Sequence, residues 1–196
     1  MFTRRLLLAA PLLLIASAAH ARAWAERLVD AAEAQIGRTV IYDPAYVKIG
    51  YPGGDVPDDR GVCTDVVIRA YRDGLDFDLQ KAVHEDMTAH FAAYPKHWGL
   101  SQADSNIDHR RVPNLQTFFK RRNAALAMSE NAADYLSGDL VTMRLPGNLP
   151  HIGIVSGTMN DEASRPLLVH NIGGGTQRQD VLFTYPVTGH YRFTPG

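Results

Sequence analysis

The sequence predicts an α+β domain in which N-terminal helices pack on one face of a C-terminal antiparallel β-sheet. Before Gly138, apolar residues recur at helical intervals in several segments. After Gly138, short β-rich runs alternate with Gly, Pro and Asn turns, which is typical of an antiparallel meander. The sequence has no internal repeat and no long linker. We therefore expect a single domain.

The first 21 residues have the pattern of a secretory signal peptide. Arg4 and Arg5 precede an apolar run that starts at Leu6, and small residues lead up to Ala21. We expect cleavage after Ala21, so that residues 22–196 form a periplasmic or secreted domain. The apolar run is shorter than the roughly 20 residues of a spanning helix, so no stable membrane insertion is expected after cleavage. The arginine pair fits both the general secretory route and the twin-arginine route.

The charge of the chain argues against polyanionic partners. The formal net charge is −1, and this value includes the two arginines of the leader. The mature chain is therefore slightly more acidic, without any basic excess. Nucleic acid and anionic membrane surfaces are consequently not expected as partners.

The helical segments come first along the chain. Apolar residues at helical spacing predict an amphipathic helix over residues 24–36 that stops at Gly37. Residues 42–59 are dense in Pro, Gly and Asp, which predicts a loop. A second helix is predicted from Cys63 to Gly74, and residues 79–92 and 113–122 also have helical patterns. Pro113 suits the first turn of the last of these helices.

The predicted strands follow Gly138 and are short. Each combines β-branched or aromatic residues with a turn signal at its end. The runs are residues 139–145, 151–157, 167–173, 181–187 and 190–193.

Cys63 is the single cysteine of the chain. It has no partner for an internal disulfide, so it is a buried inert residue, a residue bonded to another molecule, or a reactive thiol. A position in the first turn of a helix favours the thiolate, because unpaired N–H groups and the helix dipole lower the pKa there. The position alone does not separate a nucleophile from a core residue.

A cysteine nucleophile needs a base, and two histidines are placed to supply one. His151 begins the strand "HIGIVSG", and His170 ends the strand "LLVHNIG". Neighbouring antiparallel strands would set them side by side, His151 as the base and His170 as the residue that orients it. The alternative is that each is a hydrogen-bonded histidine at a strand end.

Two other polar clusters are weaker candidates for a site. His84 and His90 are six positions apart and do not share a helix face, so a zinc site of the His-Glu-x-x-His kind is not expected. The polar loop that contains His109, Arg110 and Arg111 is either a salt-bridged structural loop or a site for substrate carboxylates.

Three stretches together resemble a known family. "YPGGDVPDDRGVCTDVV", "SGDLVTMRLPGNLPHIGIVSG" and "LLVHNIG" resemble the NlpC-type cell-wall cysteine peptidases, a papain-like superfamily. The resemblance implies a papain-like NlpC-type fold, with Cys63 as nucleophile, His151 as base and His170 as orienting residue. It also implies that Tyr51 lines the site beside the cysteine.

Residues 25–193 are moreover similar to the bacterial family of the domain of unknown function 1287, which is grouped with papain-like folds. This chain has Val62-Cys63-Thr64-Asp65 where NlpC-type enzymes carry Asp-Cys-Ser-Gly, and residues 75–122 form a longer insert. The specificity of the NlpC-type enzymes is therefore not transferred.

The expected function is that of an exported cysteine hydrolase that cleaves amide bonds in peptidoglycan stem peptides through a thioester. The residues expected to contact substrate are Tyr51, Asp65, His109, Arg110 and Arg111. Neither a metal nor an organic cofactor is expected. The alternatives are an amidase or acyl or peptidyl transferase on another envelope amide, and a non-catalytic peptidoglycan-binding protein.

Overall fold

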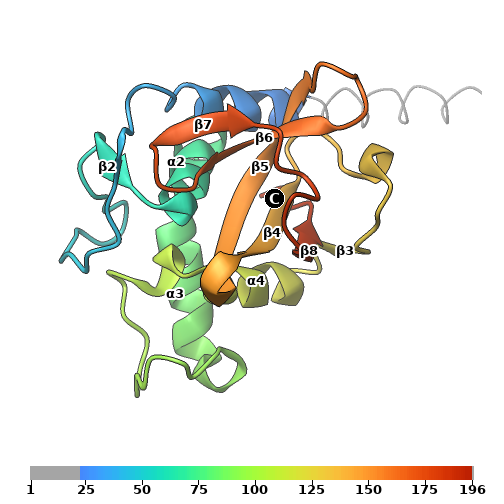
Figure 1. The fold of residues 1–196 in the computed structure, drawn as a ribbon. Coiled ribbons are helices and arrows are strands. Elements are labelled where there is room, and N and C mark those ends of the chain that lie inside the picture. The colour runs from blue at the N-terminus through green and yellow to red at the C-terminus, as the bar shows by residue number, and fades with distance from the viewer. Residues whose placement is uncertain (1–22, 196) are drawn as a thin grey trace, which may run out of the picture.

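An antiparallel sheet forms the centre of the molecule (Figure 1). The computed structural model describes residues 23–195, so the predicted signal peptide lies outside the described residues. In that range the sheet has six strands in the order β3-β8-β4-β5-β6-β7. The strands are β3 (Ala125–Leu126), β4 (Leu140–Leu145), β5 (Leu149–Met159), β6 (Pro166–Asn171), β7 (Thr176–Gln179) and β8 (Val187–Tyr191). A separate parallel pair joins β1 (Ile41–Tyr42) to β2 (Arg60–Gly61).

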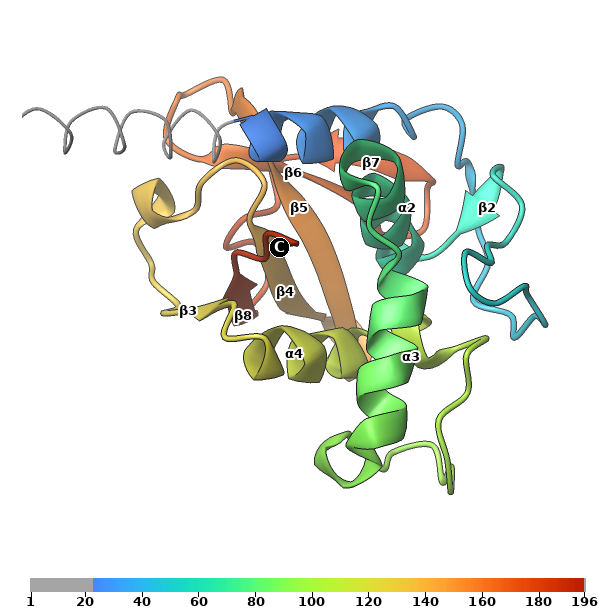
Figure 2. The same cartoon turned by 180° about the vertical axis from the view of Figure 1, so that it is seen from behind.

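The helices gather on one face of this sheet, as Figure 2 shows from behind. Residues 23–33 are helical, and α2 (Cys63–Leu75), α3 (Leu79–Ala89) and α4 (Val112–Arg121) follow. Short 3-10 turns occupy η1 (Phe91–Ala93), η2 (Asp108–Arg110), η3 (Ala132–Asp134) and η4 (Pro146–Asn148). One continuous apolar cluster joins α2 and α4 to the sheet strands β4, β5, β6 and β8. The predicted α+β architecture, with helices on an antiparallel sheet, is confirmed.

Helix α2 follows the predicted apolar spacing. Val66, Val67 and Tyr71 are fully buried against the sheet and the neighbouring helices. The helix continues past Gly74 and ends at Asp76, which adopts the left-handed conformation. A Cβ at Gly74 would lie 2.5 Å from the carbonyl oxygen of Arg27, so glycine allows α2 to touch the first helix. This residue serves close helix packing, and the predicted stop at Gly74 was too early.

The other face of the sheet is covered by loops. A second apolar cluster contains Val141, Met143, Val155 and Leu168 from the strands, with Leu182 from a connecting segment. Residues 181–187 were predicted as a strand, but residues 182–184 form a turn, and β8 starts only at Val187. The apolar residues of this segment cover the sheet. They do not extend it.

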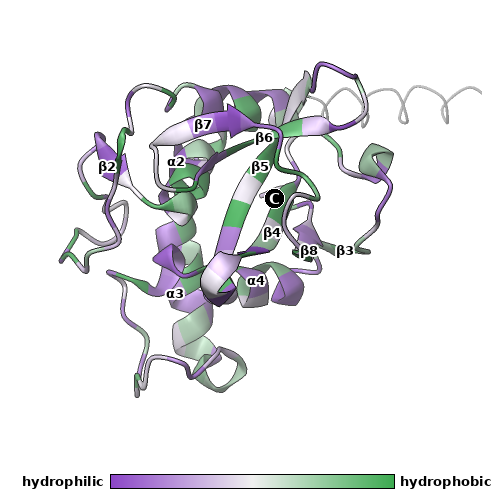
Figure 3. Cartoon of the chain, viewed as in Figure 1, coloured by the Kyte–Doolittle hydropathy of each residue, from purple (hydrophilic) through white to green (hydrophobic). Residues whose placement is uncertain are grey.

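Strand β7 has a sequence that did not predict a strand. Its residues are Thr, Gln, Arg and Gln, and Figure 3 shows it as a hydrophilic arrow beside the more apolar β5 and β6. It pairs with β6 at the sheet edge, where Arg178 lies opposite Val169. None of the helices within residues 23–195 is both long enough and apolar enough to span a bilayer.

Candidate active site

Cys63 is the first residue of α2 and is only 4% exposed. Its burial raises the pKa of the thiol from 9.0 to about 12. Backbone N–H groups of Ile152, Thr64 and Cys63 itself act in the opposite direction through hydrogen bonds to the sulfur, and the charge of Asp65 adds to the increase. The sequence-based expectation of a lowered pKa was therefore wrong, because desolvation outweighs the helix-start N–H groups.

Two contacts hold the start of α2 in place. The Asn171 side chain at the end of β6 donates a 3.1 Å hydrogen bond to the carbonyl oxygen of Gly61. The backbone N–H of Val62 donates to Asp65 Oδ2 at 2.7 Å, which satisfies one of the free donors at the helix start. Cys63 is therefore fixed between the sheet and its own helix.

His151 and His170 form a hydrogen-bonded pair on neighbouring strands. His151 Nε2 lies 2.9 Å from His170 Nδ1, and both side chains are buried. The register of β5 and β6 pairs Ile154 with Val169, which sets His170 opposite Gly153. A Cβ at Gly153 would lie 3.2 Å from the Cβ of His170, so the glycine leaves space for the two rings.

The backbone of β5 links this pair to the thiol. Ile152, whose N–H points to the sulfur of Cys63, directly follows His151 in the chain. Because Nε2 of His151 contacts His170, Nδ1 is the ring nitrogen that remains for Cys63. The backbone of β5 thus reaches the thiol, whereas within residues 23–195 neither histidine ring lines the pocket or makes a hydrogen bond to Cys63.

Both imidazoles are neutral at neutral pH. Burial, with a smaller effect of His170, lowers the pKa of His151 to about 3. Burial lowers the pKa of His170 to about 4. The nearby Gln179 side chain acts in the opposite direction, although it makes no hydrogen bond to Nε2 of His170 among the described residues. If His151 Nδ1 accepts the thiol proton, Nε2–H must donate to His170 Nδ1, which leaves the proton of His170 on Nε2. That nitrogen is buried without a hydrogen-bond partner among residues 23–195.

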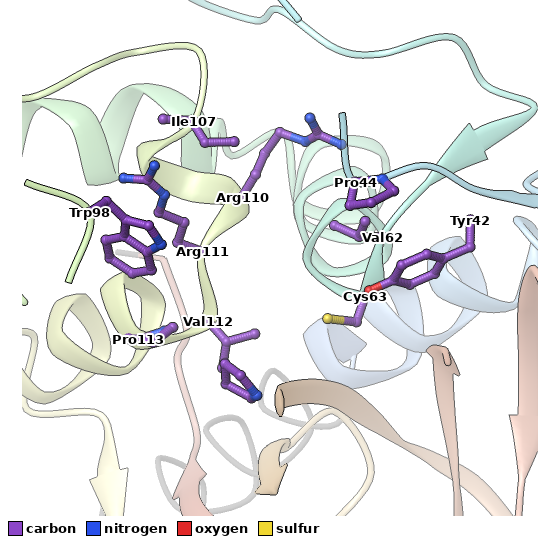
Figure 4. Close-up of a pocket in the computed structure, with 11 residues that line it drawn as sticks. Tyr42, Pro44, Val62, Cys63, Trp98, Ile107, Arg110, Arg111, Val112 and Pro113 are labelled. Atoms are coloured by element: carbon purple, nitrogen blue, oxygen red, sulfur yellow. The ribbon is translucent and has the colours of Figure 1, made fainter. Parts of the chain in front are cut away.

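A pocket of about 190 Å³ opens beside the sulfur of Cys63 (Figure 4). Residues from α2, the loop after β1, η2 and the start of α4 line it. They are Tyr42, Pro44, Val62, Cys63, Trp98, Ile107, Arg110, Arg111, Val112, Pro113 and Pro150.

Tyr42, in place of Tyr51, is the tyrosine beside the cysteine. Tyr42 lines the pocket, and its pKa is raised by burial and by the nearby Cys63. Tyr51 is 43% exposed and packs its ring edge-on against His84 at 5.0 Å. The β1–β2 pairing, which sets Tyr42 opposite Gly61, explains this placement because it carries Tyr42 to the start of α2. The resemblance to the NlpC-type motif had selected Tyr51, which does not line this pocket.

Asp65 and Arg110 are paired with each other inside the protein. Arg110 Nε and Nη2 donate to the two carboxylate oxygens of Asp65, each at 2.9 Å, and both side chains are 2% exposed. Arg110 also donates to the carbonyl oxygens of Ala45 and Asp43. This ion pair joins η2, the loop after β1 and the first turn of α2. Arg110 lines the pocket, whereas its charge is already matched within the fold.

The remaining predicted substrate residues differ in position. His109 is buried outside the pocket, and burial with the neighbouring charge of Arg110 lowers its pKa to about 3. Arg111 lines the pocket and stacks over Trp98, with its guanidinium carbon 4.0 Å from the ring centroid. No sequence pattern pointed to Trp98, which lies in the insert before η2. Within residues 23–195, no cluster of three His, Cys, Asp or Glu side chains could hold a metal ion.

Comparisons with known proteins place these residues in a family context. The family described as "Domain of unknown function (DUF1287)" matches residues 29–193, which include every residue of the pocket. The "Uncharacterized protein YijF" of Escherichia coli strain K12 is 55% identical over 166 residues, which cover 85% of this chain and 80% of that protein.

Proposed function

The chain belongs to the DUF1287 family, and we propose that it is an exported cysteine hydrolase that cleaves amide bonds in peptidoglycan peptides. The observation that carries this proposal is the buried His151–His170 pair, which lies next in the chain to the Ile152 N–H that reaches the sulfur of Cys63, while Cys63 itself lines an open pocket. A nucleophile, a base and a residue that orients the base are the three parts that such hydrolysis needs.

The first step is proton transfer coupled to attack. His151 Nδ1 takes the proton of the Cys63 thiol while the sulfur forms a bond to the substrate carbonyl carbon. Because burial makes a free thiolate costly, the negative charge passes to the substrate oxygen as the bond forms. The backbone N–H groups of Cys63 and Thr64, in the first turn of α2, contact the sulfur in the free protein and would turn to that oxygen as the S–C bond forms.

The intermediate then collapses to a thioester. The C–N bond breaks, and the leaving amine takes the proton held by His151. Water attacks the thioester with His151 again as base, which releases a carboxylic acid and restores the thiol. His170 accepts the hydrogen bond from His151 Nε2 throughout and so fixes the ring orientation and its tautomer.

Three further observations support an envelope substrate. The signal-like leader favours an envelope substrate, and the absence of basic excess disfavours polyanions. A helix-start cysteine, a strand histidine and a second histidine also resemble the arrangement in NlpC-type, papain-like peptidases of the cell wall. Amide bonds in peptidoglycan peptides fit all of these observations.

A second candidate function is a non-catalytic peptidoglycan-binding protein. One observation favours it, which is that Cys63 is almost fully buried and its thiol has a raised pKa. An inert core cysteine would have the same properties.

The test uses the mature protein, residues 22–196, with purified peptidoglycan and mass spectrometry of the released peptides. The wild type should release new fragments, and both Cys63→Ala and His151→Ala should release none. His90→Ala is the matched control, because this exposed histidine ends α3 away from the pocket. Cleavage that persists in Cys63→Ala would refute the nucleophile, and binding without cleavage in the wild type would establish the second candidate. The fragment ends identify the bond, and capture by an added amine would indicate transfer.

A further inference from the structure

The pocket beside Cys63 has an unbalanced positive charge. Its charged lining residues are Arg110 and Arg111, and neither Asp nor Glu lines it. Arg110 is neutralised by its bidentate pair with Asp65. Arg111 makes no salt bridge within residues 23–195, so its charge is the one left for a ligand.

The Arg111 side chain is partly buried and stacks on Trp98. Its guanidinium lies over the Trp98 ring, and its Nη1 is buried without a hydrogen-bond partner among the described residues. Burial lowers the pKa of Arg111, while Asp108 and Asp104 oppose the shift without bonding to it. Stacking on Trp98 fixes the plane of the guanidinium, so little side-chain entropy is lost on binding.

Two helix starts add to the same field. Val62 is the N-cap of α2 and Arg111 is the N-cap of α4, and neither supplies a side-chain cap. Both residues line the pocket, so the positive ends of two helices of ten residues or more meet there. Figure 4 shows these two helix starts on opposite sides of the pocket. The positive ends of the two helix dipoles favour an anion there.

We propose that this pocket binds a carboxylate of the substrate peptide through Arg111, on a residue next to the amide that Cys63 attacks. The pocket has a volume of about 190 Å³ and opens to solvent beside the sulfur of Cys63. The proposal deepens the proposed function and rests on it for the position of the scissile bond. It makes Arg111 the residue that selects acidic substrates.

The test compares peptides that differ only in charge. Stem peptides of peptidoglycan are prepared with each carboxylate replaced in turn by a carboxamide, and kcat/KM is measured for each. The wild type should lose about 10-fold to 150-fold for one of the replacements, the range of a charged hydrogen-bonded contact. In Arg111→Gln this preference should vanish, and Arg111→Lys should restore part of it, because the charge returns without the planar fork.

Arg122→Gln is the matched control, since Arg122 also lies over an aromatic ring, that of Phe118, but outside the pocket. It should keep the wild-type preference. Equal kcat/KM for every peptide in the wild type, or a preference that survives in Arg111→Gln, would overturn the proposal.

A binding measurement separates this proposal from the catalytic one. Calorimetry with Cys63→Ala should show tighter binding of the carboxylate peptide than of its carboxamide, and the double variant with Arg111→Gln should bind both equally. If the wild type cleaves nothing but this difference in affinity is present, the hydrolase is refuted and the carboxylate pocket stands. If Cys63→Ala binds both peptides equally, the carboxylate pocket is refuted whether or not cleavage occurs.

Discussion

Replacing Asp65 by Asn tests whether the buried ion pair with Arg110 holds the site together. Asp65→Asn keeps the shape of the side chain and one oxygen for the N–H of Val62. It removes the negative charge that faces Arg110 across two 2.9 Å hydrogen bonds. Arg110 then becomes a buried cation without a counter-ion.

The expected cost is large because both partners are only 2% exposed. Breaking a buried pair by removing one partner costs about 3–5 kcal/mol, most of it from the charge left behind. For a domain of this size each kcal/mol lowers Tm by about 2–4 °C, so Tm should fall by about 6–20 °C. The pocket should also loosen, since Arg110 positions the loop after β1 through the carbonyl oxygens of Ala45 and Asp43.

Thermal unfolding followed by circular dichroism measures the effect, and Asp58→Asn is the matched control. The Arg38–Asp58 pair has a similar separation, 2.8 Å, but its side chains are 56% and 70% exposed. Its loss should cost at most about 1 kcal/mol. The double variant Asp65→Leu with Arg110→Met should recover much of the stability, because no buried charge remains. Equal Tm values for Asp65→Asn and Asp58→Asn would refute this reasoning.

Two further predictions concern pH. Burial raises the pKa of the Cys63 thiol to about 12, so the thiolate fraction rises with pH over the whole range from pH 6 to 10. The rate of alkylation by iodoacetamide should therefore increase about tenfold per pH unit. A rate that levels off below pH 8 would indicate a thiolate–imidazolium pair instead. Burial also lowers the pKa values of His109, His151 and His170 to about 3, 3 and 4. Below pH 6.5 these histidines are protonated in the unfolded chain but still neutral in the folded protein, so the free energy of unfolding should fall as the pH drops. Each histidine contributes up to about 1.4 kcal/mol per pH unit, and urea unfolding with the same free energy at pH 7 and pH 5 would contradict this.

The parts of the fold that were predictable are those whose pattern follows from burial on one face. The period of α2 and the apolar runs of β4, β5 and β6 reflect a single shared core, so sequence periodicity located them. Strand β7 was missed because it lies at the sheet edge, where polar residues suffice. Residues 181–187 were mistaken for a strand, since Leu182 is buried as a cover over the second face.

Within the candidate site, the sequence order indicated Cys63, His151 and His170, and the fold pairs the two histidines and brings the backbone of Ile152 to the sulfur of Cys63. The sequence motif selected Tyr51 and missed Tyr42, because the position of Tyr42 depends on the pairing of β1 with β2. The stacking of Trp98 on Arg111 was not predicted either, since it depends on how a long insert folds. Long-range packing decides such questions, and no local pattern encodes it.

Helix α2 is far in sequence from β5 and β6, the strands that it packs against, and this has a consequence for the order of folding. The apolar face of α2 packs against β5 and β6, about 90 residues later in the chain. Contacts of such high contact order form slowly, after a long loop has closed. Until then the Cys63 thiol is exposed and has an ordinary pKa, so oxidants can reach it. When the sheet is complete the sulfur is buried, so correct folding protects the single thiol from oxidation.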